Sequence, residues 1–278
     1  MRFIKYQALG NDYIISDSTE PTVKLTEKQI SRICHRNFGV GADGILCWSA
    51  GTQDGSFNLR IFNPDGSEAE KSGNGIRIFA RYLWEKSNKR QTKFVIATAG
   101  GTVKAEMLKD GKNVCAEMGQ ASFHSSKIPV AGPPREVINE TMEIEGETVT
   151  YCGVTIGNPH CVVICDNVCA ETTRRLGPLI EHDSRFPNRT NIQFMQVLDR
   201  HNIKIEIWER GAGYTLSSGT SSCAAAAAAF RMGLCDSEIT VHMPGGDIGV
   251  SINDDFSLRI TGPVTKVIEG VISEEILE

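Results

Sequence analysis

The feature that most constrains the fold of this chain is an internal repeat. A strand-like segment, a polar loop, a Ser-Gly pair and a helix-like segment occur at residues 63–72 and again at residues 209–218, so that Ser218 lies 146 residues after Ser72. A Gly-Asn turn recurs in the same way, because Asn158 lies 147 residues after Asn11. Landmarks at a nearly constant offset predict two related domains, each with one Ser-Gly helix start.

The domain boundary is predicted from proline and glycine. With 278 residues the chain is long enough for two domains. Residues 119–140 contain Pro129, Pro133 and Pro134 together with Gly132, a composition typical of a linker. We therefore expect an N-terminal domain at residues 1–118 and a C-terminal domain at residues 119–263. The tail, residues 264–278, is expected to return to the first domain.

The apolar pattern alternates as strands through most of both halves and has helical spacing only in short stretches. Helices are expected at residues 26–36, 72–85, 169–182 and 219–230. The last is rich in alanine, which has the highest helix propensity. The pattern therefore predicts strands and helices in both halves of the chain.

Charge and composition exclude several classes of protein. The net charge is −5 and no cluster of Lys and Arg rivals the acidic residues, which argues against binding to nucleic acid or to an anionic membrane. The sequence contains no run of 18 apolar residues and no basic leader before an apolar segment. Nine cysteines without paired short spacing favour reduced thiols in the cytoplasm over a disulfide framework.

Two further motifs are weaker than they look. Residues 39–44 match the dinucleotide pattern G-x-G-x-x-G, but they follow a helix-like segment and precede a strand, the reverse of the order that nucleotide binding needs. Cys161 and Cys165 lie near His160 and Cys169, yet the segment alternates as a buried strand and lacks the spacing of a zinc site. We expect neither a nucleotide nor a metal.

Ser72 and Ser218 each precede a helix, where unpaired N–H groups and the helix dipole favour a carboxylate and stabilise negative charge. Each serine can also be an ordinary cap, and the repeat can be a structural duplication without function. Two such sites facing one cleft between the domains suit the inversion of a carbon beside a carboxylate. One group removes the α-proton and the other returns it on the opposite face, without a cofactor.

The residues around these sites resemble the diaminopimelate epimerase family. The resemblance covers essentially the whole chain and is carried by NPDGSEAEKSGNG at residues 63–75, GNPH at residues 157–160 and ERGAG at residues 209–213. It implies the α+β class, with two pseudo-symmetric domains, each a curved, mostly antiparallel sheet around a central helix. It also implies a cofactor-independent epimerase that interconverts LL- and meso-2,6-diaminopimelate in lysine and peptidoglycan biosynthesis, and a homodimer.

The family's substrate-binding residues are present in this sequence. By resemblance, the carboxylate and amine at the reacting centre would meet Asn11, Gly73, Asn74, Gly219 and Thr220. The distal end of the substrate would meet Asn63, Asn158, Asn191, Glu209 and Arg210. A fork of guanidinium donors and a carboxylate suit the second amino-acid head of such a ligand. His160 is expected near the catalytic centre, although it can also be a satisfied histidine in a buried turn.

The departure from the family concerns the chemistry itself. The family uses two cysteines as base and acid, and this sequence has Ser72 and Ser218 at those positions. A serine hydroxyl is far less acidic than a thiol and needs activation. Cys223 is not expected to substitute, because five residues along a helix turn it away from Ser218. Tyr214 stands where many members carry Glu, and Gly44 where some carry Gln.

Two other functions remain open from the sequence. In neighbouring proline racemase-like families, loss of a thiol accompanies dehydratase chemistry, and a related branch isomerises unsaturated acids. One remaining base suits elimination or double-bond migration. The chain can also be a catalytically silent relative that binds an amino acid in the cleft. All three functions involve a small-molecule ligand.

Overall fold

The computed structural model describes residues 1–16, 25–51 and 55–277. The chain forms two compact units. Unit 1 contains Met1–Glu117 and the segment from Thr261 to the end of the chain, and unit 2 contains Met118–Ile260.

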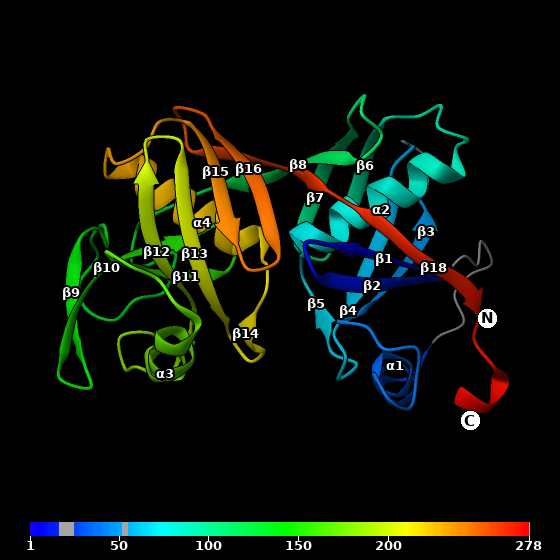
Figure 1. The fold of residues 1–278 in the computed structure, drawn as a ribbon, viewed down its shortest axis with the longest axis horizontal. Helices are drawn as coiled ribbons and strands as arrows, with labels where there is room; N and C mark the ends of the chain where they lie inside the picture. Colours follow the sequence, from blue (N-terminus) through cyan, green and yellow to red (C-terminus); the bar gives the residue numbers. More distant parts are fainter. Residues whose placement is uncertain (17–24, 52–54, 278) are drawn as a thin grey trace. The chain divides into compact units, whose positions relative to one another are not determined.

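Unit 1 is a sheet around one helix (Figure 1). Its strands are β1 (Arg2–Ala8), β2 (Asn11–Ser16), β3 (Ile45–Ala50), β4 (Phe57–Phe62), β5 (Glu68–Ala69), β6 (Lys93–Thr98), β7 (Gly101–Met107) and β18 (Thr265–Val271). The strand β8 (Asn113–Gln120) pairs with β7 and continues into unit 2. Most pairs are antiparallel, and the pairs β2–β3 and β4–β6 are parallel.

The helix α2 (Gly73–Lys86) is the centre of unit 1. It contacts β1, β2 and β7, and its side chains from Ile76 to Ala80 are all buried. A shorter helix, α1 (Glu27–Cys34), lies at the edge of the unit and buries Ile30 and Ile33. Its start is fixed by a capping box between Thr26 and Gln29.

Unit 2 has its own sheet and helices. Its strands are β9 (Glu140–Ile144), β10 (Glu147–Thr155), β11 (Pro159–Ile164), β12 (Asn191–Asp199), β13 (Asn202–Glu209), β14 (Gly213–Thr215), β15 (Glu238–Met243) and β16 (Gly246–Ile252). The strand β17 (Ser257–Pro263) begins in unit 2 and ends in unit 1. The central helix α4 (Gly219–Arg231) contacts β10–β13, β15 and β16. Its alanines are fully buried, so the small side chains allow the strands to approach closely on several sides.

The two units repeat the same order of pairings. β2 and β3 are parallel, as are their equivalents β11 and β12. The register also agrees, because Ile14 is opposite Ile45 and Cys161 is opposite Ile192, each residue displaced by 147. The short strands β5 and β14 occupy equivalent places before α2 and α4. The predicted α+β class and its pseudo-symmetric repeat are confirmed.

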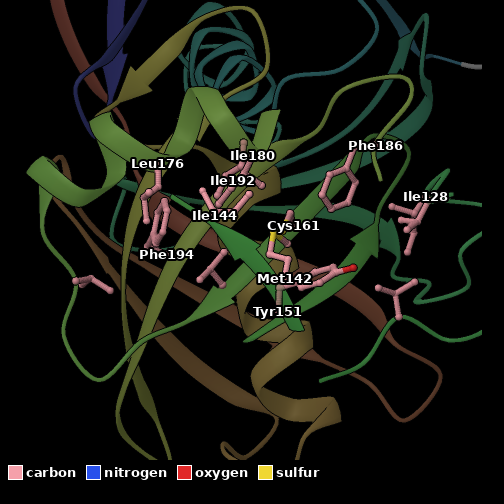
Figure 2. Close-up of a cluster of buried hydrophobic side chains, with 14 residues drawn as sticks. Ile128, Met142, Ile144, Tyr151, Cys161, Leu176, Ile180, Phe186, Ile192 and Phe194 are labelled. Atoms are coloured by element: carbon pink, nitrogen blue, oxygen red, sulfur yellow. The ribbon is translucent and has the colours of Figure 1, made fainter. Parts of the chain in front are cut away.

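The core of unit 2 shows how the second, shorter helix closes the sheet. The helix α3 (Ala170–Glu181) places Leu176 and Ile180 against Ile192 and Phe194 of β12 (Figure 2). Cys161 lies in the same cluster with no exposed surface, and burial raises the pKa of its thiol well above the usual value. This agrees with the expectation that the segment is a buried strand.

The prediction of a linker at residues 119–140 is wrong. Ser122 pairs with Thr155 and His124 with Glu136 as isolated bridges, and Ile128 and Val137 are fully buried in the core of unit 2. The prolines shape a segment that packs along β10 instead of a free connection. The segment after Pro263 contains a strand, since β18 pairs with β1 along its length.

Within the part of the chain that the structure describes, no helix is long and apolar enough to cross a membrane. In the same residues no group of three or more His, Cys, Asp or Glu side chains is arranged to hold a metal ion.

Candidate active site

Ser72 is the N-cap of α2. Its backbone is extended, and its Oγ accepts a hydrogen bond from the N–H of Gly75 at 3.1 Å. A second contact comes from β2, where the hydroxyl of Tyr13 lies 3.2 Å from the same Oγ. Gly73 and Asn74 follow as the first two residues of the helix, and both are buried. In an α-helix the N–H groups of this turn have no acceptor inside the helix. The turn is therefore suited to an anion.

A chain of amides fixes the surroundings of Ser72. The Asn74 side-chain nitrogen donates to Asn11 Oδ1 at 3.1 Å, and Asn11 Nδ2 donates to Asp43 at 3.0 Å. From the other side, the fully buried Arg77 donates to Asn74 Oδ1 at 2.6 Å. Two predicted residues, Asn11 and Asn74, are thus held together with fixed amide orientations.

Charged side chains lie next to this chain of amides. Asp12 forms an ion pair with Lys5 at 2.7 Å and with Arg36 at 3.0 Å. Burial raises the pKa of Asp12, but the hydrogen bonds and charges of Arg36 and Lys5 outweigh burial and hold that pKa below its usual value. Asp12 also accepts from the N–H of Asp43 at 2.9 Å, so the ionised carboxylate ties β2 to the segment before β3.

Asn63 lies at the end of β4, in the turn that leads to β5. Its Nδ2 donates to Ser67 Oγ at 3.0 Å, and its backbone N–H donates to the carbonyl of Ser67 at 2.8 Å. These contacts hold Asn63 in its own turn, and its assignment to the substrate stays a prediction.

Ser218 is the N-cap of α4 and matches Ser72 in backbone conformation. Its Oγ is farther from its amide partner, since the N–H of Ser221 donates at 3.4 Å, and the Oγ of Thr220 lies at 3.4 Å. Gly219 and Thr220 are the first two residues of α4. Ser221 is in turn held by Gln193, whose Nε2 donates to Ser221 Oγ at 2.9 Å.

His160 lies on β11 with no exposed surface, and its Nε2 is 2.9 Å from Asn158 Oδ1. Burial is the main reason why its pKa falls to about 3, and the positive charge of Arg210 lowers it further. The nearby Gln193 side chain raises the pKa of His160 and so opposes these two effects. The two side chains do not form a hydrogen bond, since His160 Nδ1 and Gln193 Oε1 both lack a partner. His160 is therefore neutral near pH 7.

Asn191 joins two loops of unit 2. Its Nδ2 donates to the carbonyl of Pro159 at 2.8 Å, and its Oδ1 accepts from the N–H of Arg210 at 3.0 Å. Its place opposite His160 in the β11–β12 register completes this group. Asn158, His160, Asn191 and Arg210 are thus brought together as expected from one site, with Glu209 at the end of β13 beside Arg210.

The side chain of Arg210 is exposed, and one of its nitrogens donates to the carbonyl of Asn188 at 3.2 Å. Glu181, which sequence reasoning did not single out, supports the same loop. It accepts from Gly211 N at 3.0 Å and from the indole of Trp208 at 2.7 Å.

The two departures from the family pattern have structural counterparts. The Tyr214 hydroxyl donates to the buried Glu206 at 2.7 Å, and Arg174 lies over the Tyr214 ring at 3.9 Å. Gly44 lies against Tyr13, so closely that a Cβ there would be 2.6 Å from the ring. Cys223 is fully buried in α4, next to alanines that are also fully buried.

Sequence reasoning missed the residues that orient the site: Tyr13, Asp43, Arg77, Glu181 and Gln193. Asp43 lies within residues 39–44, a segment that we interpreted from its glycines and not from its carboxylate. Tyr13 was also visible, because it lies 147 residues before His160 and is therefore its repeat equivalent. Arg77 gave no signal, since a charged residue in an apolar helix is usually placed on the surface.

The sequence matches the family model described as diaminopimelate epimerase over residues 3–124 and 152–267. It is 55% identical over 276 residues to diaminopimelate epimerase 2 of a Nostoc species, covering 99% of this chain and 97% of that protein. It is 38% identical to diaminopimelate epimerase of Moorella thermoacetica, covering 97% of this chain and 98% of that protein.

Solved structures share the fold at low identity. A hydroxyproline epimerase from Agrobacterium vitis has a TM-score of 0.73 at 13% identity, covering 98% of this chain and 91% of that chain. A methylitaconate-delta-isomerase has a TM-score of 0.61 at 12% identity, covering 100% of this chain and 97% of that chain. These likenesses concern the fold alone. The family match and the nearly full-length relatives decide the assignment: the chain belongs to the diaminopimelate epimerase family.

Proposed function

We propose that the chain is a cofactor-independent isomerase that interconverts LL- and meso-2,6-diaminopimelate. The observation that carries this proposal is the 55% identity to a diaminopimelate epimerase across 99% of the chain. Its reaction would serve lysine and peptidoglycan biosynthesis in the cytoplasm.

The proposed substrate has an amino-acid head at each end, and the described groups suit both. For the reacting head, the first turns of α2 and α4 supply N–H groups, from Gly73 and Asn74 in one repeat and from Gly219 and Thr220 in the other. For the distal head, Arg210 offers guanidinium donors and Glu209 a carboxylate. Asn63 and Asn158 would add amide contacts. Asn191, whose two amide ends already bind backbone, would position the loop of Arg210.

Inversion requires two proton-transfer groups, one for each face of the α-carbon. We assign these roles to Ser72 and Ser218. The oxygen of one serine, acting as a base, takes the α-proton while the electron pair stays on carbon and spreads into the carboxylate. Helix N–H groups stabilise that charge. The other serine gives its proton to the opposite face, so the two serines exchange protonation states in each turnover.

His160 is proposed as a neutral residue beside this centre. Its pKa of about 3 keeps the imidazole uncharged at physiological pH, so it can accept or donate a hydrogen bond without adding positive charge. In this proposal a water or substrate atom connects His160 to Ser218.

The test is product identity. LL-diaminopimelate is incubated with the chain in heavy water and followed by NMR. The proposal predicts deuterium at one α-carbon and formation of the meso isomer. Loss of water or ammonia, or a shifted double bond, would instead support a dehydratase or isomerase, the chemistry that a single base would suit. Thermal stabilisation by the amino acid without any exchange would support a silent binding relative.

We also propose a homodimer, as the family resemblance implies. Light scattering on the purified chain checks this directly. A mass of one chain at micromolar concentration would contradict it.

A further inference from the structure

The contact between Tyr13 and Ser72 adds a residue to the proposed site. Tyr13 is only 6% exposed, and its hydroxyl lies 3.2 Å from Ser72 Oγ. The N–H of Gly75 reaches the same oxygen at 3.1 Å. A hydroxyl oxygen has two lone pairs, and a serine that has lost its proton has three. Two donors can therefore bind a deprotonated Ser72 Oγ and still leave one lone pair for an α-proton.

The position of the Tyr13 ring depends on Gly44. A Cβ at Gly44 would lie 2.6 Å from Cε1 of Tyr13 and 2.4 Å from the carbonyl oxygen of Phe62. Real Cβ atoms do not approach other atoms so closely, so any larger residue would displace the ring or the strand. The absence of a side chain at residue 44 is what lets the Tyr13 ring lie where its hydroxyl reaches Ser72.

The repeat supports the same interpretation independently. Tyr13 precedes Ile14, which is opposite Ile45 in the parallel pair β2–β3. His160 precedes Cys161, which is opposite Ile192 in the parallel pair β11–β12, and His160 itself is opposite Asn191. Tyr13 and Gly44 in unit 1 are therefore the equivalents of His160 and Asn191 in unit 2. Each repeat has a ring with a polar atom at the same place ahead of its Ser-Gly helix.

We propose that Tyr13 is a positioning residue for Ser72, an inference that rests on the proposed epimerase function for its kinetic consequences. The phenol donates a hydrogen bond to Ser72 Oγ, holds the side chain in one rotamer and stabilises the oxygen when it carries negative charge. A thiolate is accessible without such help, because its ordinary pKa is near 8.5. Tyr13 therefore matters for a serine at residue 72 and little for a cysteine.

The hydrogen bond is tested without turnover. The five tyrosines are labelled with carbon-13 at Cζ, and the Tyr13 signal is assigned with Tyr13→Phe. We expect Ser72→Ala to shift that signal and the pH at which it titrates. Tyr151 is a matched control, because it is buried and its hydroxyl donates to Glu140 in unit 2. An unchanged Tyr13 signal in Ser72→Ala would overturn the proposal.

The kinetic role is tested by comparing two backgrounds. With Ser72 in place, Tyr13→Phe should lower kcat for α-proton exchange about tenfold, the effect of one lost hydrogen bond, with KM within about twofold. In Tyr13→Phe the rise of the exchange rate with deprotonation of Ser72 should occur at higher pH, because the deprotonated serine has lost a hydrogen-bond donor. In the Ser72→Cys background, the same substitution should change kcat by less than about threefold. Tyr151→Phe should have no effect in either background.

Equal losses in both backgrounds would show that Tyr13 only packs against the site, and would overturn the proposal. If no background exchanges the α-proton, the proposed function fails instead. The carbon-13 measurement still decides whether Tyr13 binds Ser72, so the two failures are distinguishable.

Discussion

At the scale of single residues, the two serines of the repeat are not equivalent. Ser72 Oγ lies 3.1 Å from its amide donor and 3.2 Å from the Tyr13 hydroxyl. Ser218 Oγ lies 3.4 Å from its amide donor and from the Thr220 hydroxyl. Shorter contacts from two donors favour a negative charge on Ser72 over one on Ser218. The repeat places a serine at the start of each central helix, and the contacts around each oxygen make the two serines different.

His160 makes the stability of unit 2 depend on pH. Its pKa falls from an ordinary value of 6.5 to about 3 in the folded chain. Between these values the unfolded chain binds a proton that the folded chain does not, so stability is full above pH 6.5 and is lost as pH falls. From pH 7 to pH 4.5 this one group should lower the free energy of unfolding by about 2–3 kcal/mol.

The measurement is urea unfolding of the parent chain and of His160→Gln at both pH values. The variant should lose less stability than the parent over this interval. His182→Gln, which removes an exposed imidazole, is the control and should follow the parent. Parallel losses in the parent and His160→Gln would contradict the assignment of a buried neutral histidine.

At the scale of elements, the start of α2 combines a cap with the proposed chemistry, and the two roles are separable. Glycine is tolerated at an N-cap far better than alanine. We expect Ser72→Ala to lower the free energy of unfolding by about 1 kcal/mol, and Ser72→Gly by only a few tenths. Both variants should lose α-proton exchange, because neither has a group that can carry the proton.

Thermal or urea unfolding and the exchange assay, run on the same samples, check this separation. Ser87→Ala, at the other end of the same helix, is the control and should keep exchange. Full exchange in Ser72→Gly would mean that Ser72 is only a cap.

The helices and most strands could be predicted because their signals are local. The caps at Thr26, Ser72 and Ser218 and the alanine-rich run of α4 are visible in a few residues. The strand β18 was not predicted, because Val267, Ile268 and Val271 are exposed and give no alternation between buried and exposed positions. It forms by pairing with β1, a partner about 260 residues away in sequence that no local pattern reveals.

At the scale of the whole molecule, the function was inferred from the internal repeat. The offset between Asn11 and Asn158, and between Ser72 and Ser218, predicted two units before any pairing was known. What it could not provide was the register of β2 with β3, which brings Tyr13 against Gly44. Hydrogen bonds join Asn11 to Asn74, Asn158 to His160 and Asn191 to Arg210, and the roles of these residues toward the substrate stay predictions.

The central claim is that this scaffold inverts an α-carbon by proton transfer from residues 72 and 218. The most direct measurement is α-deuterium incorporation into LL-diaminopimelate by the Ser72→Cys/Ser218→Cys double variant in heavy water, beside the parent chain and the thiol control Ser87→Cys. We expect the double variant to exchange the α-proton at least about 100-fold faster than the parent and to form the meso isomer. No exchange in a folded double variant would contradict it.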